Sequence, residues 1–363
     1  MFSRRRFLSL MAATAAAAGM HRGIAGAVPR PVRLGILAPS HCALPVVLAG
    51  ARGLFGSQGL DAEVRYFPEM EEIAAALVAD GLDFGQLAVP MAVGMNQGAA
   101  GAPAQTPLTI VQVLGINGGA LSVGTATPIR KLAELHGKRI GIHSPWIIHR
   151  TIFLRMMDQY GMRPGRDFEL VQVPLSGLGA ALEEGRIEGI IGPEPGPSLL
   201  AAKGVARPLL YTKTFWTDHP CCVLATRRDH FERDPDLVAD VTRAVMVAGL
   251  TLDSIVLRNE AIGEAHRSSP AYERLPLDLL LQAFGPTRSD FYPFPFHSSL
   301  RVVVEQMAAA GVLAADTDPG QVATAMIPAP FSLEVLLQAA QEVPNARVPD
   351  GYERDERLRI IGS

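Results

Sequence analysis

The strongest restriction on the fold is an alternation of short apolar strands and helices that occurs twice along the chain. The first series begins with a strand at 32–37, and the second begins with a strand at 138–142. Residues 77–85 and 182–190 follow the same order, which is the end of a helix, a glycine turn and a short apolar strand. Strands that alternate with helices are typical of parallel sheets covered on both faces. The sequence therefore predicts an α/β protein built from two similar units.

The ends of these strands predict where a ligand binds, because ligands of open α/β sheets lie outside the carboxyl ends of the strands. The stretch GIIGPEPGP, at 189–197, places Glu194 directly after such a strand and between two prolines. Proline fixes the backbone, so the Glu194 side chain is held in one direction and the ordering cost of binding falls. Glu194 either meets a ligand in a cleft between the two units or forms an ion pair with a basic residue such as Lys203 or Arg207.

The N-terminus is typical of an exported bacterial protein. Three arginines at 4–6 precede an apolar, alanine-rich stretch, and residues 25–27 have the small-x-small pattern of a cleavage site. Residues 3–8 closely resemble the twin-arginine export motif. We expect residues 1–27 to be a twin-arginine signal peptide and the mature protein to be periplasmic, the alternative being a basic amphipathic helix. We expect no transmembrane helix elsewhere in the chain.

The composition excludes one class of partner. With 33 Lys and Arg against 36 Asp and Glu, the net charge is −3, so we expect no nucleic acid to bind. The pattern becomes helical from Asp234 onward. Residues 291–296 are an aromatic, proline-rich linker that we interpret as a surface loop, and residues 344–363 are interpreted as a polar tail.

The three cysteines are Cys42, Cys221 and Cys222. Export permits disulfides, but an odd number leaves at least one thiol free or paired elsewhere, and the pairing stays open. The adjacent pair lacks the CxxC spacing of a metal motif. We therefore interpret the cysteines as small buried hydrophobic residues.

Several short motifs, in their order and spacing, resemble the solute-binding components of ABC transporters in the nitrate/bicarbonate group of the nitrate/sulfonate/taurine superfamily. They are His41–Pro45, Ala51–Phe55, Val89–Val93, Asn117–Val123, Gly192–Pro195 and Trp216–Cys222. The resemblance implies a two-lobed periplasmic-binding-protein type II fold, with mixed, mostly parallel sheets, helices on both faces and a ligand cleft between the lobes.

The same resemblance implies how the chain is divided. Lobe 1 is expected to contain residues 32–122 and 226–343, and lobe 2 to contain residues 123–225. The two strand crossings between the lobes are expected at 121–125 and 222–226.

The resemblance also implies a ligand site. It places His149 at the anion-contacting histidine of the family, and Glu194 at a position that meets a divalent cation such as calcium in bicarbonate-binding relatives. A lone histidine is otherwise a surface or satisfied core residue, and Trp146 either forms a stacking wall or packs in the core. The expected ligand-binding residues are Ser40, His41, Met70, Pro90, Asn117, Gly119, Ser144, Trp146, His149 and Glu194.

Two departures make nitrate itself doubtful as the ligand. Met70 stands where the nitrate binders have a tryptophan, and Gly119 stands where they have a glutamine. A missing amide leaves a nitrate oxygen unpaired, which costs about 1–3 kcal/mol. Carboxylates near the pocket would also repel a bare anion unless a cation bridges them. The ligand then has donors or positive charge, or a divalent ion accompanies it.

The resulting functional prediction is an extracytoplasmic solute-binding protein, a monomer that captures a small polar molecule or anion and delivers it to an ABC permease and its ATPase. We expect no catalytic residue and no cofactor other than the possible cation. One alternative is a ligand sensor that acts on a partner protein. The other is an enzyme like that of the pyrimidine-synthesis branch of the superfamily, although no GxSxG, HExxH or phosphate-binding loop is present.

Overall fold

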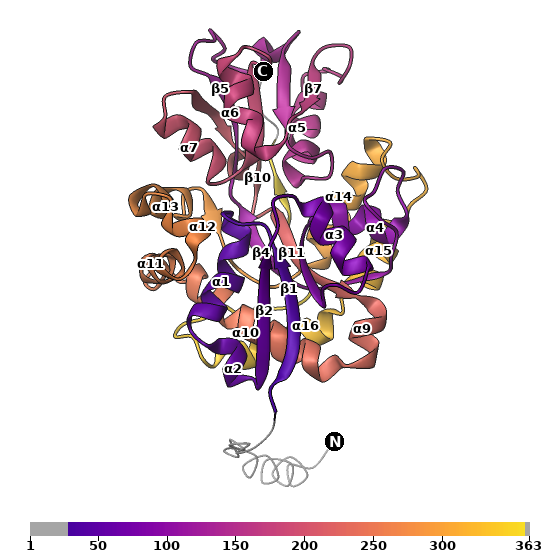
Figure 1. Cartoon of the computed structure of the whole chain (residues 1–363). Helices are drawn as coiled ribbons and strands as arrows, with labels where there is room; N and C mark the ends of the chain where they lie inside the picture. The colour runs from indigo at the N-terminus through magenta and orange to yellow at the C-terminus, as the bar shows by residue number, and fades with distance from the viewer. Residues whose placement is uncertain (1–27, 360–363) are drawn as a thin grey trace, which may run out of the picture.

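The computed structural model describes residues 28–359, so the expected signal peptide lies outside the described residues. The described chain forms two lobes, each built on one sheet (Figure 1). The sheet of the first lobe has the order β12-β4-β11-β3-β1-β2, and that of the second lobe has the order β7-β6-β8-β5-β9. The strands of the first sheet are β1 (Arg30–Ile36), β2 (Leu60–Tyr66), β3 (Phe84–Ala88), β4 (Leu108–Asn117), β11 (Pro220–Arg227) and β12 (Ser289–Asp290). Those of the second are β5 (Gly119–Gly124), β6 (Arg139–Ile142), β7 (Glu169–Gln172), β8 (Gly189–Pro193) and β9 (Ala206–Tyr211).

The two sheets share one arrangement, which confirms the predicted α/β architecture. β1 lies between β2 and β3 in parallel, and β11 runs antiparallel beside β3. In the second lobe β6 lies between β7 and β8 in parallel, and β5 runs antiparallel beside β8. The matching segments 77–85 and 182–190 lead into β3 and β8, which are equivalent strands. Every residue of β3 and β4 is buried, as expected for central strands covered on both faces.

Helices cover both sheets (Figure 1). In the view of Figure 1, α1, α2 and α10–α13 lie on one side of the first lobe, and α3, α4, α9, α14 and α15 lie on the other. The helices up to β11 are α1 (Leu44–Ala51), α2 (Leu54–Ser57), α3 (Met70–Val78), α4 (Val89–Gln97), α5 (Ile148–Gln159), α6 (Leu178–Glu183), α7 (Gly196–Ala202) and α8 (Thr212–Phe215). The later helices are α9 (Arg228–Arg233), α10 (Pro235–Asp253), α11 (Arg258–Ser268), α12 (Pro270–Glu273), α13 (Leu277–Ala283), α14 (His297–Ala309), α15 (Pro319–Met326) and α16 (Ala329–Ala340). Within the described residues, the short 3-10 helices are η1 (His41–Ala43), η2 (Leu132–Leu135) and η3 (Leu175–Gly177).

The chain changes sheets at other places than the resemblance implied. It leaves the first sheet at the end of β4 and enters the second at the start of β5, with only Gly118 between them. Asn117 and Gly118 both have positive φ, 58° and 68°, which redirects the chain there. It returns between β9 and β11, through α8. The expected crossings at 121–125 and 222–226 are therefore wrong, because these segments lie mostly inside β5 and β11.

The aromatic linker at 291–296 lies in the core rather than at the surface. Its four aromatic side chains are buried, and the Pro293 carbonyl accepts a hydrogen bond from the Val113 N–H at 2.9 Å. The prediction that this linker is a surface loop was wrong, because the linker lies beside β4 and its aromatic side chains pack in the core. Its prolines need no backbone donors there.

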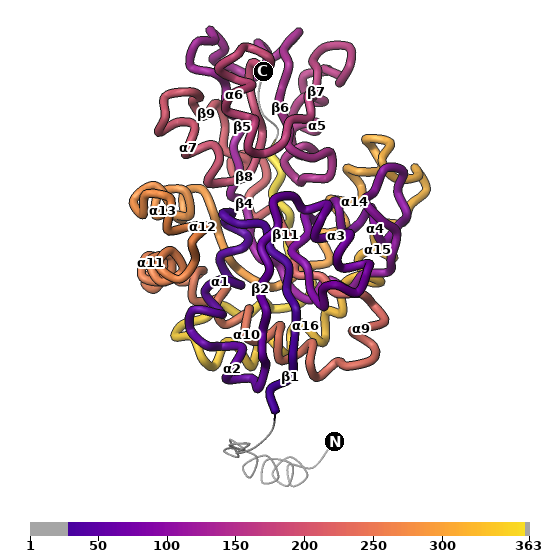
Figure 2. The backbone as a smooth tube through the Cα atoms, in the orientation of Figure 1, coloured from indigo at the N-terminus to yellow at the C-terminus, as the bar shows by residue number. Residues whose placement is uncertain are grey.

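The segment expected to be a polar tail carries a strand. β13 (Arg357–Leu358) pairs antiparallel with β10 (Trp216–Thr217), which lies in the return connection between the lobes. Glu356 accepts a hydrogen bond from the Trp216 indole N–H at 2.9 Å, and the Arg359 N–H donates to the Phe215 carbonyl. The yellow end of the tube in Figure 2 shows this segment between the lobes, far from the first described residues.

Within residues 28–359, none of the single helices has both the length and the apolar character to cross a membrane. The bent pair α15 and α16 meets the requirement by length and composition only.

Candidate functional site

A cavity lies between the two lobes, where the carboxyl ends of β1, β3, β6 and β8 meet. Its empty space, counted with its opening, is about 330 Å³, but its narrow interior admits roughly one water molecule. First-lobe and second-lobe residues both contribute to it, and none of these lining residues is charged. They are Leu37, Ser40, His41, Cys42, Met70, Gln86, Ala88, His143, Ile147, Ile148, His149, Pro193, Cys221 and Cys222.

Histidines are the main polar groups of this region. His41 follows β1, His143 follows β6, His149 lies in the first turn of α5, and His219 directly precedes β11. All four are buried, and each has at least one ring nitrogen without a hydrogen-bond partner among the described residues. For His149, both ring nitrogens lack one. Buried polar atoms are normally paired, so the unpaired nitrogens of His41, His143 and His149, which line the cavity, are available to a bound solute or ion.

Burial keeps these imidazoles neutral at pH 7, because removal from water disfavours the charged form. It lowers the pKa of His143 to about 4 and that of His219 to about 3. Burial also lowers the pKa values of His41 and His149, the latter well below its usual range. The cavity therefore offers neutral donors and acceptors rather than positive charge, so a bare anion would receive little compensation there.

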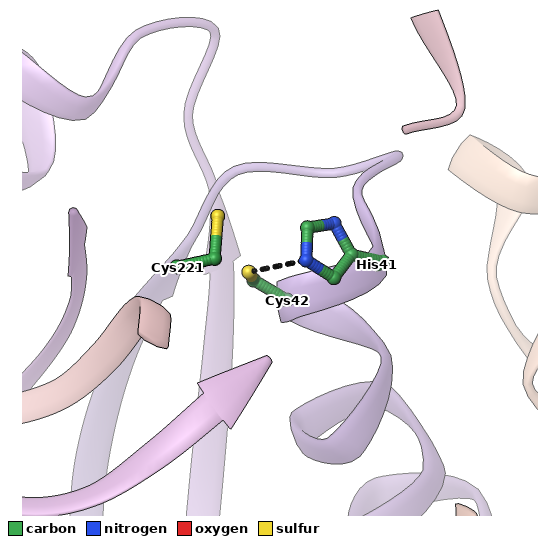
Figure 3. Close-up of side chains that lie close together, drawn as sticks. All are labelled: His41, Cys42 and Cys221. Atoms are coloured by element: carbon green, nitrogen blue, oxygen red, sulfur yellow. Dashed lines mark hydrogen bonds between the residues drawn. The ribbon is translucent and has the colours of Figure 1, made fainter. Parts of the chain in front are cut away.

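Three free thiols lie beside these rings. Cys42 Sγ is 3.3 Å from His41 Nε2, and Cys221 Sγ is 3.9 Å from Cys222 Sγ. The ligating atoms of His41, Cys42 and Cys221 all lie within 4.8 Å of one another. Figure 3 shows the three side chains close together. None of the three cysteines forms a disulfide. The prediction that the cysteines are buried is confirmed, but they form a cluster, because η1 brings Cys42 against the start of β11.

Two glycines at the crossing make room for the rings. A Cβ atom at Gly118 would lie 2.4 Å from His41 Nε2, and one at Gly119 would lie 2.2 Å from His149 Cδ2. No side chain fits at either position unless a histidine moves. In this structure the His149 ring therefore occupies the space into which a side chain at 119 would project.

Four of the ten expected ligand-binding residues line the cavity, namely Ser40, His41, Met70 and His149. The other six lie outside this lining: Pro90, Asn117, Gly119, Ser144, Trp146 and Glu194. Sequence reasoning missed His143, Gln86 and the cysteines as lining residues. His143 ends the same strand–loop unit as Ser144, so its position after β6 was the available signal.

Ser144 and Trp146 join the two lobes instead. The Ser144 hydroxyl donates to Glu71 Oε1 of the first lobe at 2.6 Å. The Trp146 indole N–H donates to the Gly101 carbonyl, also in the first lobe, at 3.0 Å. The Trp146 ring packs against Gly94, where a Cβ atom would lie 2.4 Å away. These contacts hold the lobes in a closed arrangement.

Glu194 forms a third contact between the lobes. Its carboxylate is fully buried, lies 3.4 Å from Arg288 Nη1 of the first lobe and accepts the Ser198 N–H at 3.1 Å. Its N–H donates to the Gly118 carbonyl, and its own carbonyl accepts the His41 N–H. Of the two possibilities for Glu194, the structure contains the ion pair, but the partner is Arg288 rather than Lys203 or Arg207.

The residues around Glu194 do not fit a calcium ion. Calcium takes six to eight oxygen ligands. Both Glu194 oxygens already accept hydrogen bonds, and the Arg288 guanidinium places a positive charge where the cation was expected. Burial raises the pKa of Glu194 despite this guanidinium.

Two sheets of matching order, a chain that passes from one to the other and back, and a cavity lined by both lobes define the periplasmic-binding-protein fold of type II. The chain belongs to the NMT1-like family, which it matches over residues 25–265.

Curated relatives and solved structures agree with this assignment. The chain is 24% identical over 232 residues to the nitrate/nitrite binding protein NrtA of Synechocystis sp., a match that covers 60% of this chain and 52% of that protein. It is 23% identical over 304 residues to the bicarbonate-binding protein CmpA of a Synechococcus species, with 71% of this chain and 66% of that protein covered. The chain thus spans about half to two thirds of the length of these relatives. The crystal structure of NrtA from Synechocystis aligns with a TM-score of 0.77 at 22% identity, over 90% of this chain and 93% of that one.

Two further similarities bear on partners and on catalysis. The nitrate import ATP-binding protein NrtC of Synechococcus elongatus is 28% identical over 249 residues, which cover 63% of this chain and 36% of that protein. The desulfurization enzyme DSZB shares the fold, with a TM-score of 0.58 at 15% identity over 85% of this chain and 99% of that one. The fold alone therefore does not separate binding from catalysis.

Proposed function

We propose that this protein is the extracytoplasmic solute-binding component of an ABC importer, which encloses a small polar solute between its lobes and delivers it to a permease. The interlobe cavity carries the proposal, because residues of both lobes contribute to its wall. A solute bound there contacts both lobes at once, so it favours the closed arrangement over the open one. The relatives named for nitrate and bicarbonate binding support the same role.

The lining favours some solutes over others. Nitrate and other bare anions would meet neutral imidazoles and thiols rather than a guanidinium or ammonium group, so their charge would be desolvated without compensation. A neutral polar molecule, or a ligand that carries positive charge, fits this wall better. The small free space further requires a small solute or a wider opening of the lobes before capture.

Catalysis is the less supported alternative. A thiol beside an imidazole is the arrangement of nucleophilic enzymes, and Cys42 and His41 are 3.3 Å apart. However, burial raises the pKa of Cys42 and lowers that of His41, so the pair stays neutral at pH 7. Reactive cysteines need an environment that stabilises the thiolate. The neutral pair therefore gives Cys42 no nucleophilic character, although hydrogen bonds with Cys221 and Cys42 lower the pKa of the neighbouring Cys222 thiol well below its usual range.

The test begins with a thermal-shift screen of the mature protein against nitrate, nitrite, bicarbonate with and without calcium, sulfonates, cyanate, urea, amines and pyrimidines. A true ligand at about 100 times its Kd stabilises the folded state by about 2.7 kcal/mol. Small-angle scattering then measures whether the radius of gyration falls on binding. With the ligand known, stimulation of ATP hydrolysis by the reconstituted permease and ATPase tests delivery.

Two tryptophan variants localise the site. Met70 lines the cavity, so Met70→Trp fills it and abolishes the ligand-induced shift. Tyr66 is 47% exposed and does not line the cavity, so Tyr66→Trp keeps the shift. A shift that survives in Met70→Trp would place the site elsewhere and refute the proposal.

A further inference from the structure

Three donor atoms of the cavity already lie near the distances that one metal ion requires. Tetrahedral zinc has Zn–S bonds of about 2.3 Å and Zn–N bonds of about 2.0–2.1 Å, which place its ligand atoms about 3.5 Å apart for N and S and about 3.8 Å apart for two S atoms. Cys42 Sγ and His41 Nε2 are 3.3 Å apart. With Cys221 Sγ, all three donors lie within 4.8 Å of one another, so their separations exceed those of a zinc site by at most about 1.3 Å.

The same donors exclude the hard cations. Calcium and magnesium take oxygen ligands, whereas thiolate and imidazole select zinc, monovalent copper and similar ions. Zinc with two thiolates and one imidazole has no net charge. That neutrality suits a wall without charged side chains, because a net charge buried there would remain uncompensated.

Packing alone does not explain the cluster. Small buried hydrophobic residues need no imidazole beside them, and an unpaired buried polar atom costs about 1–3 kcal/mol. His41 Nδ1, His143 Nδ1 and both nitrogens of His149 have no partner among the described residues. In addition, Gly118 lies so close to His41 that no larger residue fits there without displacing the ring.

The three ligands come from one lobe, while the second lobe contributes histidines to the wall of the same cavity. His41, Cys42 and Cys221 belong to the first lobe, whereas His143 and His149 reach the same cavity from the second. An ion held by three ligands of the first lobe keeps an open position. A chelated solute can fill that position, since among the described residues the ligand group of this closed arrangement contains no second-lobe imidazole.

We propose that the interlobe cavity binds a thiophilic transition-metal ion, with Zn²⁺ as the ion, through His41 Nε2, Cys42 Sγ and Cys221 Sγ. Each thiol loses its proton as its Zn–S bond forms, so two protons are released for every ion bound. This inference rests on the proposed function, because the ion, free or chelated, is the captured solute.

The experiment uses tag-free mature protein, reduced and stripped of metal with a chelator. Zn²⁺ affinity is measured by competition with a chromophoric chelator, and proton release by calorimetry in two buffers of different ionisation enthalpy. We expect one Zn²⁺ and about two protons per chain. Co²⁺ in place of Zn²⁺ should give the strong near-ultraviolet absorption of a thiolate-bound ion.

The double variant Cys42→Ser/Cys221→Ser keeps the volume of the site and should lose at least 100-fold in Zn²⁺ affinity, together with the Co²⁺–thiolate absorption. Met246→Leu is the matched control, because Met246 is buried in α10 of the first lobe and does not line the cavity, and it should retain both. Should the double variant fail to fold, the single Cys42→Ser variant and the Co²⁺ spectrum of the wild type decide. Equal Zn²⁺ affinity in wild type and variant, or a Co²⁺ spectrum without thiolate absorption, would overturn the assignment.

The two proposals fail separately. Metal binding without a fall in the radius of gyration and without stimulation of the permease ATPase would leave the metal site standing and remove the transport role. Closure on another solute, with no metal bound by the reduced protein, would do the reverse.

Discussion

Acid should destabilise this protein through its buried histidines before its carboxylates contribute. An unfolded histidine has a pKa of about 6.5. His143 and His219 have folded-state pKa values of about 4 and about 3, lowered by burial. The unfolded state therefore binds protons that the folded state does not, and the free energy of unfolding falls as the pH falls below about 6.5.

The magnitude follows from these values. Between pH 7.5 and 5.5, one histidine that stays neutral when folded costs about 1.4 kcal/mol. His143 and His219 both remain neutral at pH 5.5, so together they cost about 3 kcal/mol, and His41 and His149 act in the same direction. Domains are commonly stable by only about 5–15 kcal/mol, so the loss is large. Glu194 works in the opposite sense, because burial raises its pKa and the folded state takes up its proton first.

The assay is urea unfolding at pH 7.5, 6.5 and 5.5 with a chelator present. His143→Leu removes one titrating ring and should reduce the pH-dependent loss by about 1.4 kcal/mol. His136, whose side chain is 69% exposed, supplies the control, and His136→Gln should keep the full loss. A free energy of unfolding that stays level from pH 7.5 to 5.5, or a loss of equal size in His143→Leu, would refute the reasoning.

Two other predictions concern contacts at the crossing. Gly119→Ala places a Cβ atom 2.2 Å from the His149 ring and should destabilise the fold by about 1–3 kcal/mol, measured by urea unfolding. Gly124→Ala, where the nearest atom is 3.5 Å from the new Cβ atom, should not destabilise it. Equal effects of the two substitutions would contradict the conclusion that Gly119 makes room for the His149 ring. Glu194→Leu leaves Arg288 without its carboxylate and should lower the free energy of unfolding by about 3–5 kcal/mol. The double variant Glu194→Leu/Arg288→Met should recover most of this loss. A double variant no more stable than the single one would argue against the ion pair.

The repeat explains why the architecture was predictable from sequence. The matching segments 77–85 and 182–190 form the same helix end and strand in each lobe, and this local periodicity needs no knowledge of partners. His41 begins η1 after β1, and His149 lies in the first turn of α5 after β6, so each follows the carboxyl end of a strand in its own sheet. Their place in the cavity wall therefore follows from chain order alone.

Contacts between distant segments were not predictable in the same way. The cysteine cluster depends on β11 lying between β3 and β4, so residues 42 and 221 meet only after the return crossing. Arg288 reaches Glu194 across 94 residues of sequence. The crossing at Gly118 could not be located from the sequence, because all residues of β4 and β5 are buried. The single residue between the two strands gives no polar loop that would mark a boundary.

The pairing of β13 with β10 limits how the molecule can open. With only the two chain crossings between the lobes, the second lobe could both bend away from the first lobe and twist against it. The final segment adds a third tether beside them, fixed by the Arg359 N–H to the Phe215 carbonyl and by Glu356 to the Trp216 indole. A third tether restricts twisting of one lobe against the other, so we expect a jaw-like motion in which the lobes open about these connections. A spectroscopic probe at Arg357 would therefore lie near the pivot, whereas one at Arg30, at the start of β1, would lie at the far end of the first lobe.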